Sequence, residues 1–200
     1  MTILDIRFSD WIQKGFELFT TNSLMLILSG LVAGAISAVT LGLLAGPMLA
    51  GLAIIVLNLM DNRLAKPTVN DIFKGFEYFK ESIPVTLFFY ALFIVVWLLQ
   101  RVPFPGHMVS AVVTSVGASL AVMSVFHLVA RKISPLASWR NWFELFKVNW
   151  GPLLGFFILA AIIGGCGLIL FGVGLVVTLP LYFCILGMAY IAISSQTAAL

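Results

Sequence analysis

The sequence predicts an all-α polytopic membrane protein with six transmembrane helices, arranged as three parallel repeats of an interfacial amphipathic helix followed by a transmembrane hairpin. Composition, long uncharged runs and a motif that recurs three times predict it. Of the 200 residues, 62% are hydrophobic and 10% are charged, with a mean hydropathy of +1.12. Soluble domains carry about 25% charged residues, so this chain has too few polar side chains to cover a water-soluble globule.

Uncharged runs mark the first three crossings, since a membrane helix needs about 20 mostly apolar residues. Residues 23–60 carry no charged side chain. As a helix this run would be about 57 Å long, which is enough for two crossings and a turn. The residues expected at the turn are Gly42, Gly46 and Pro47. The uncharged run at 82–100 forms the third crossing.

The second half of the chain contributes three further crossings. The Pro-Phe-Pro-Gly segment at 103–106 cannot continue a helix, so the fourth crossing begins at His107 or Met108 and ends at Ala130. Residues 148–200 carry no charged side chain and hold two crossings, predicted at 152–171 and 174–194. The break between these two is expected in a cluster of glycines, Gly164, Gly165, Gly167, Gly172 and Gly174.

The distribution of basic residues predicts the orientation. Six crossings place both termini on one side of the membrane. Of the 11 Lys and Arg residues, all except Arg101 fall on that side, as do the eight acidic residues. Cytoplasmic loops are enriched in Lys and Arg, so both termini are expected to be cytoplasmic. Topology and anionic headgroups then explain the net charge of +3, and no nucleic-acid partner is expected.

A short motif introduces each hairpin. It reads Lys-Gly-Phe-Glu-Leu-Phe at 14–19, Lys-Gly-Phe-Glu-Tyr-Phe at 74–79 and Trp-Phe-Glu-Leu-Phe at 142–146. Because two crossings follow each copy, all three copies have the same orientation and the repeat is parallel. We therefore expect a single membrane domain over residues 1–200, with repeat units at about 9–63, 68–131 and 134–196.

Each motif belongs to a stretch with helical periodicity. Apolar residues at helical spacing, opposite a charged face, are typical of a helix that lies in the membrane interface. Thr68 with Asp71 predicts a capping box, and Ser134 before Pro135 predicts a cap with a first-turn proline. The side chains expected to face lipid are Trp11, Ile12, Phe16 and Phe19, then Ile72, Phe73, Phe76 and Phe79, then Trp139, Trp142, Phe143 and Phe146.

Three glutamates are candidate functional residues because they occupy one position of the repeat. These are Glu17, Glu77 and Glu144. One interpretation is that each forms an ion pair on a solvated helix face with the basic residue one turn earlier. The other is a ring of three carboxylates around a pseudo-threefold axis at a cytoplasmic mouth. The basic residues concerned are Lys14, Lys74 and Arg140.

Asn58 and His127 are the other two candidates. They fall near the cytoplasmic ends of the second and fourth crossings, where a polar side chain has either a structural or a functional role. No charged residue lies in the middle of a crossing, which counts against an ion-coupled transporter. Motifs for nucleotide binding, metal binding and nucleophilic catalysis are missing from the sequence. We therefore assign no catalytic, cofactor-binding or metal-binding residue and do not expect an enzyme.

The first repeat unit resembles a known group of proteins. The Lys-Gly-Phe-Glu helix is followed by Ala-Gly-Pro-Met-Leu-Ala-Gly at 45–51 and by Asp-Ile-Phe-Lys-Gly-Phe at 71–76. These segments are similar to uncharacterised bacterial inner-membrane proteins built from such units, which are related to the membrane domain accompanying some glycerophosphodiester phosphodiesterases. The resemblance covers residues 10–80 and includes no catalytic domain. It implies a multi-pass protein of the bacterial inner (plasma) membrane.

Two functions fit these features. The concentration of charged residues on one side favours a non-enzymatic organising or regulatory protein. Such a protein would bind membrane lipids, a partner membrane subunit or a second copy of itself through its cytoplasmic amphipathic helices. The alternative is a small-solute or lipid transporter or channel along the pseudo-threefold axis. A tightly packed axis would argue against this alternative.

Overall fold

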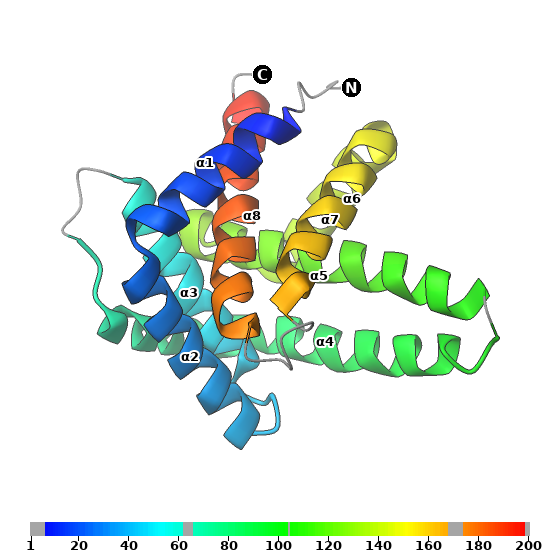
Figure 1. Ribbon diagram of the computed structural model, residues 1–200, viewed down its shortest axis with the longest axis horizontal. Coiled ribbons are helices and arrows are strands. Elements are labelled where there is room, and N and C mark those ends of the chain that lie inside the picture. The colour runs from blue at the N-terminus through cyan, green and yellow to red at the C-terminus, as the bar shows by residue number, and fades with distance from the viewer. Residues whose placement is uncertain (1–6, 62–65, 104, 168–173, 199–200) are drawn as a thin grey trace.

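The computed structural model describes residues 7–61, 66–103, 105–167 and 174–198, and its regular structure in these ranges is entirely helical (Figure 1). The predicted all-α class is therefore confirmed. In chain order the helices are α1 (Phe8–Thr21), α2 (Ser23–Val39), α3 (Ala45–Met60), the 3₁₀ helix η1 (Val69–Tyr78), α4 (Phe79–Leu99), α5 (Pro105–Arg131), α6 (Pro135–Val148), α7 (Trp150–Gly165) and α8 (Leu175–Ala198).

Within the described residues, three helical segments are long and apolar enough to cross a membrane by themselves. They are Val69–Leu99, Pro105–Arg131 and Leu175–Thr197. The count rises to five if each bent pair forms one span, since the chain turns by 91° between α1 and α2 and by 114° between α6 and α7. The predicted six spans are not reached by this criterion because α2, α3 and α7 have only 17, 16 and 16 residues. A helix of 16 residues is about 24 Å long, shorter than the hydrocarbon core of about 30 Å.

The helix boundaries follow the predicted breaks, with a shift in the first hairpin and an earlier start of α5, at Pro105 instead of His107 or Met108. The turn lies at 40–44, where Gly42 has φ +85°, a conformation that favours glycine. Gly46 and Pro47 were expected in this turn but lie in the first turn of α3. Proline fits there because its missing N–H would have no partner in the first turn. Gly172 and the end of the first repeat unit at position 63 lie outside the described residues.

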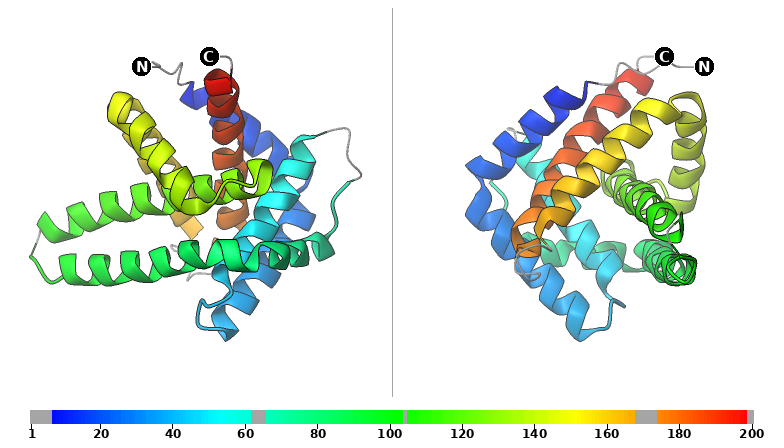
Figure 2. Two further views of the ribbon diagram at one scale, coloured as in Figure 1. Left: turned by 180° about the vertical axis from the view of Figure 1, so that it is seen from behind. Right: turned by 45° about the vertical axis from the view of Figure 1, so that its right-hand side comes forward.

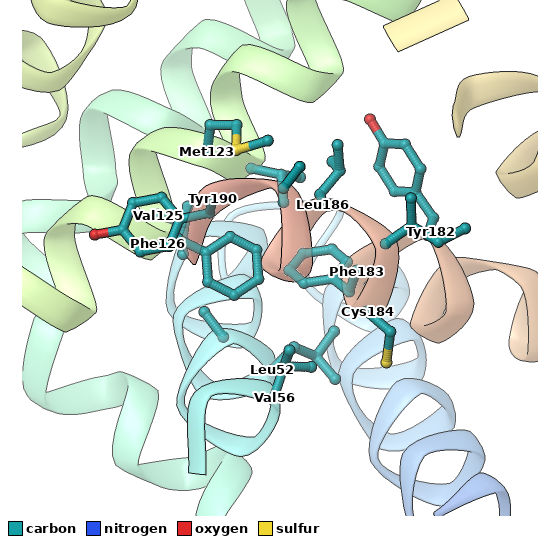
Figure 3. Close-up of a cluster of buried hydrophobic side chains, with 14 of the residues drawn as sticks. Leu52, Val56, Met123, Val125, Phe126, Tyr182, Phe183, Cys184, Leu186 and Tyr190 are labelled. Atoms are coloured by element: carbon teal, nitrogen blue, oxygen red, sulfur yellow. The ribbon is translucent and has the colours of Figure 1, made fainter. Parts of the chain in front are cut away.

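Three helices form the centre of the protein. Helices α3, α5 and α8 all pack against one another, and Figure 3 shows the apolar side chains that meet between them. Gly187 of α8 permits this close approach. A Cβ atom at position 187 would lie 2.9 Å from Cγ1 of Val56 and 3.1 Å from Cζ of Phe126. Other buried residues of this cluster are Leu52, Met123, Phe183, Leu186 and Tyr190.

Helices α2, α4 and α7 pack around this centre. Helix α2 contacts α3 and α8, α4 contacts α5 and α3, and α7 contacts α8 and α5. Hydrogen bonds join outer to inner helices: Gly46 N–H donates to Thr86 Oγ1 (3.0 Å), and the Thr178 hydroxyl donates to the Gly164 carbonyl (2.6 Å). Interhelical bonds of this kind contribute about 0.6 kcal/mol each in membrane proteins.

Each motif-bearing helix packs closely on one inner helix. Helix α1 lies on α8, η1 lies on α3, and α6 lies on α5. Glycines permit two of these contacts. A Cβ atom at Gly15 would lie 2.7 Å from the Ile185 Cα, and one at Gly75 would overlap the Pro47 carbonyl oxygen. These helices are therefore held against the protein as well as facing outward.

This packing corrects the prediction that whole apolar stripes face lipid. Trp11 and Phe19 of α1, Ile72 of η1 and Trp142 of α6 are buried inside the protein. The stripe of each helix is divided, because one flank packs on the inner helix and the other flank stays outside. The stripe residues that remain exposed are Phe16, Phe73, Phe76, Phe79 and Phe143.

The α4–α5 hairpin extends beyond the other helices (Figure 2). The buried residues of α4 are Ser82, Val85 and Thr86, which all lie near its beginning. Further along α4, large apolar side chains such as Phe93 and Leu98 are exposed. This part of the hairpin therefore offers an apolar surface to its surroundings.

Candidate functional site

Four of the five candidate residues line two clefts beside the amphipathic helices. The α1–α3–α8 cleft has a volume of about 670 Å³ and contains Glu17 and Asn58. Its other charged lining residues are Lys14, Asp61 and Lys66. Carboxylates and ammonium groups thus share this cleft.

The α5–α6–α8 cleft has a volume of about 440 Å³ and contains His127 and Glu144. Its remaining lining residues are Arg131, Ile133, Asn141, Trp142, Leu145, Val148, Ile193, Ser194 and Thr197. The fifth candidate, Glu77, is exposed on η1 and lines neither cleft. The structure therefore places the three repeat glutamates in three different surroundings and does not bring them together at one mouth.

The ion pairs also differ from those predicted on the amphipathic helices. Lys74 pairs with Asp71 (2.6 Å) rather than with Glu77, because the capping box with Thr68 holds the Asp71 carboxylate beside it. Glu144 pairs with Lys147 (2.9 Å) rather than with Arg140. Exposed pairs like these contribute about 0–1 kcal/mol, so they orient the side chains more than they stabilise the fold.

His127 is buried and accepts two hydrogen bonds from α6. Its Nδ1 lies 2.7 Å from the Ser138 hydroxyl and 3.1 Å from Nε1 of Trp142. An indole N–H can only donate, so Nδ1 is an acceptor. The Ser138 hydroxyl then also donates to Nδ1, and the neutral ring carries its hydrogen on Nε2. These two bonds fasten α6 to α5.

Aromatic contacts extend this network to α8. The His127 ring lies 5.4 Å from the Trp142 ring and 5.0 Å, edge to face, from the Tyr190 ring, measured between centroids. His127, Trp142 and Tyr190 therefore join α5, α6 and α8 at the wall of the α5–α6–α8 cleft. The histidine has a structural role in this network, and it also shapes the cleft.

Sequence reasoning missed the partners of His127 and the role of Arg131 in the cleft. The four-residue spacing of Ser138 and Trp142 places them on one face of a helix. Nothing in the sequence connects that face to His127, because a break at 132–134 separates the two helices. The angle between α5 and α6 determines this contact, and the packing of α6 on α5, α4 and α7 sets that angle.

Among the described residues, no group of three His, Cys, Asp or Glu side chains is arranged to hold a metal ion. The chain matches no protein-family model, no curated protein and no solved structure. The geometry of the clefts and of the amphipathic helices therefore carries the functional argument.

Proposed function

We propose that the chain is a multi-pass inner-membrane protein with a non-enzymatic organising role, which binds lipid on its charged side through its three amphipathic helices. One observation carries this proposal. Phe16, Phe76 and Phe143 stand at the same position of the repeated motif and are 55%, 38% and 57% exposed. The residue before each of them is buried against the protein.

Exposed phenylalanines at the end of a membrane helix favour insertion between lipids. Moving a phenylalanine from water into an apolar environment contributes about 1.5–3 kcal/mol. Lys14, Lys74 and Arg140 lie close by on the same helices and would attract anionic headgroups. Three such helices on one membrane surface would order the lipids around the protein.

The proposal includes six spans in three units. The outer helices would be α2, α4 and α7, and the inner helices α3, α5 and α8. Each amphipathic helix then packs on the inner helix of the preceding unit, and α1 closes the cycle on the last unit. Helices of 16 or 17 residues would span through local thinning of the bilayer, which costs a fraction of a kcal/mol per Å.

The packing at the centre supports an organising role over transport along the axis. Phe126, Val56 and Gly187 are in close contact where the three inner helices meet (Figure 3). Apolar side chains fill this part of the described structure, and the alternative of a solute pathway along the axis gains no support from it.

Chemical labelling in intact cells tests the topology. Cys166 and Cys184 would be replaced by alanine, and single cysteines would be introduced by Lys74→Cys, Arg140→Cys and Arg101→Cys. With a membrane-impermeant maleimide, we expect labelling at position 101 only, until permeabilisation exposes positions 74 and 140. Positions 74 and 140 on opposite sides of the membrane would overturn the three-unit arrangement.

Photo-crosslinking tests lipid binding by the amphipathic helices. Benzoylphenylalanine, which closely resembles phenylalanine, would replace Phe16, Phe76 or Phe143 in native membranes. Because all three side chains are exposed at the proposed headgroup level, we expect phospholipid adducts at each position by mass spectrometry.

The lipid-facing control is benzoylphenylalanine at Phe93, which is 70% exposed on α4. Lipid adducts at position 93 together with none at the three motif positions would overturn the proposal. A single protein adduct shared by the three positions would also overturn it and would favour a partner subunit.

A further inference from the structure

We infer that the α5–α6–α8 cleft binds the phosphate group of an anionic phospholipid, with Arg131 as the principal ligand. This inference rests on the proposed lipid-binding function and gives it a defined site. It follows from the few contacts that the Arg131 guanidinium makes, the ion pair that engages the Glu144 carboxylate of the same cleft, and the apolar side chains that share the lining.

Arg131 is the last residue of α5, a helix long enough to cross the membrane, and its side chain is exposed. Its position therefore corresponds to the headgroup level. A guanidinium has five N–H donors. Here the structure shows one long hydrogen bond, from Nη2 to the Ser194 carbonyl oxygen at 3.4 Å.

Arg131 takes part in none of the ion pairs found among the described residues. The carboxylate that lines the cleft, that of Glu144, pairs with Lys147 at 2.9 Å. The Lys147 ammonium also lies 4.9 Å from the centroid of the Phe143 ring. Glu144 is thereby neutralised, and Arg131 keeps a planar fork of donors that matches two phosphate oxygens.

Neutral donors surround the cation. The Asn141 amide and the Ser194 hydroxyl line the same cleft. His127 contributes a neutral ring, because both hydrogen bonds from α6 end on its Nδ1 and leave the N–H on Nε2. The ring of Tyr190 lies against His127, and its buried hydroxyl interacts with the side chains of Ser194 and Arg131 without a hydrogen bond of regular geometry. Buried polar groups normally find a partner, and a ligand oxygen or a water held by it would supply one.

The rest of the cleft favours a lipid over a free phosphate ion. Its volume of about 440 Å³ exceeds the space that a phosphate needs and falls within the usual range for small-molecule sites. Apolar side chains share the lining: Ile133, Leu145, Val148 and Ile193. They are suited to contact the glycerol and the first methylene groups of an acyl chain.

Native mass spectrometry of the detergent-purified protein tests this site. The ligands are dioctanoyl phosphatidylglycerol, dioctanoylglycerol, which lacks the phosphate, and inorganic phosphate. We expect one phosphatidylglycerol to bind preferentially to the wild type and Arg131→Gln to weaken this binding about tenfold or more, the size expected for a charge-assisted contact. Arg131→Lys should recover part of the affinity.

Arg101→Gln is the matched control, because Arg101 is an exposed arginine that lies outside the cleft. It should bind phosphatidylglycerol like the wild type, and all variants should elute as the same folded species. Equal affinity of Arg131→Gln and Arg101→Gln would overturn the site, as would equal binding of dioctanoylglycerol. Displacement of the lipid by equimolar inorganic phosphate would overturn a lipid as the ligand.

The outcomes separate this inference from the proposed function. If Arg131→Gln binds the lipid normally while the motif phenylalanines still crosslink to lipid, the cleft is overturned and the proposed function stands. If the crosslinks fail while binding depends on Arg131, the lipid-inserting role of the phenylalanines is overturned and the cleft remains a lipid site.

Discussion

Gly75→Ala is expected to weaken the packing of η1 on α3 and to lower the melting temperature of the purified protein clearly. The added Cβ atom would overlap the Pro47 carbonyl oxygen and lie 2.5 Å from the Gly51 backbone nitrogen. Both are backbone atoms that move only if a helix shifts. Overpacking costs about 1–3 kcal/mol, and about 3 kcal/mol corresponds to a decrease of roughly 6–12 °C in a chain of this size.

Gly34→Ala is the matched control for this variant. No described atom lies within 4 Å of a Cβ placed at Gly34 in α2. Since alanine has a helix propensity better than that of glycine by about 1 kcal/mol, this variant should melt at or above the wild-type temperature. Fluorescence-detected size-exclusion after heating would measure both variants. Equal melting temperatures for the two would show that η1 does not approach α3 as closely as described.

Phe126→Ala is expected to destabilise the protein by about 3–5 kcal/mol, the usual cost of removing a buried phenylalanine. Phe126 is fully buried in α5, and its ring lies 5.6 Å from that of Tyr190 and 6.0 Å from that of Phe183. Alanine would leave a cavity where α3, α5 and α8 meet. The melting temperature in detergent and the yield of monodisperse protein should both decrease.

Phe93→Ala provides the comparison, because Phe93 is 70% exposed on α4 and makes no part of the central cluster. Its effect on stability should remain within about 0.5 kcal/mol, as for other exposed positions. A similar loss for the two variants, or no loss for Phe126→Ala, would contradict the description of a packed centre.

Sequence reasoning identified most helices because their boundaries depend on local chemistry. The capping box of Thr68 and Asp71 begins η1, as the sequence predicts, whereas α5 begins at Pro105 rather than at His107 or Met108. The predicted break near Gly42 is present as a left-handed turn. The span count did not follow from the sequence, because a charge-free run gives the length available for crossing but not the length of the helices that form within it.

The candidate site was predictable only in part. Repeat position and membrane depth singled out Glu17, Asn58, His127 and Glu144, and all four line clefts. The pairing of these residues was not predictable from spacing alone. Lys147 rather than Arg140 holds Glu144, since a residue three positions later and one four positions earlier compete for the same carboxylate.

The sequence by itself determined that this is a helical chain with membrane-spanning character, because composition and uncharged runs report directly on transfer from water to an apolar phase. Only the tertiary structure decided that Trp142 is buried while Phe143 is exposed. It also decided that the Ser138 hydroxyl forms a hydrogen bond with His127. Hydropathy cannot make that distinction, because lipid and protein interior are similarly apolar. Helix packing alone selects which side chains meet protein and which meet the surroundings.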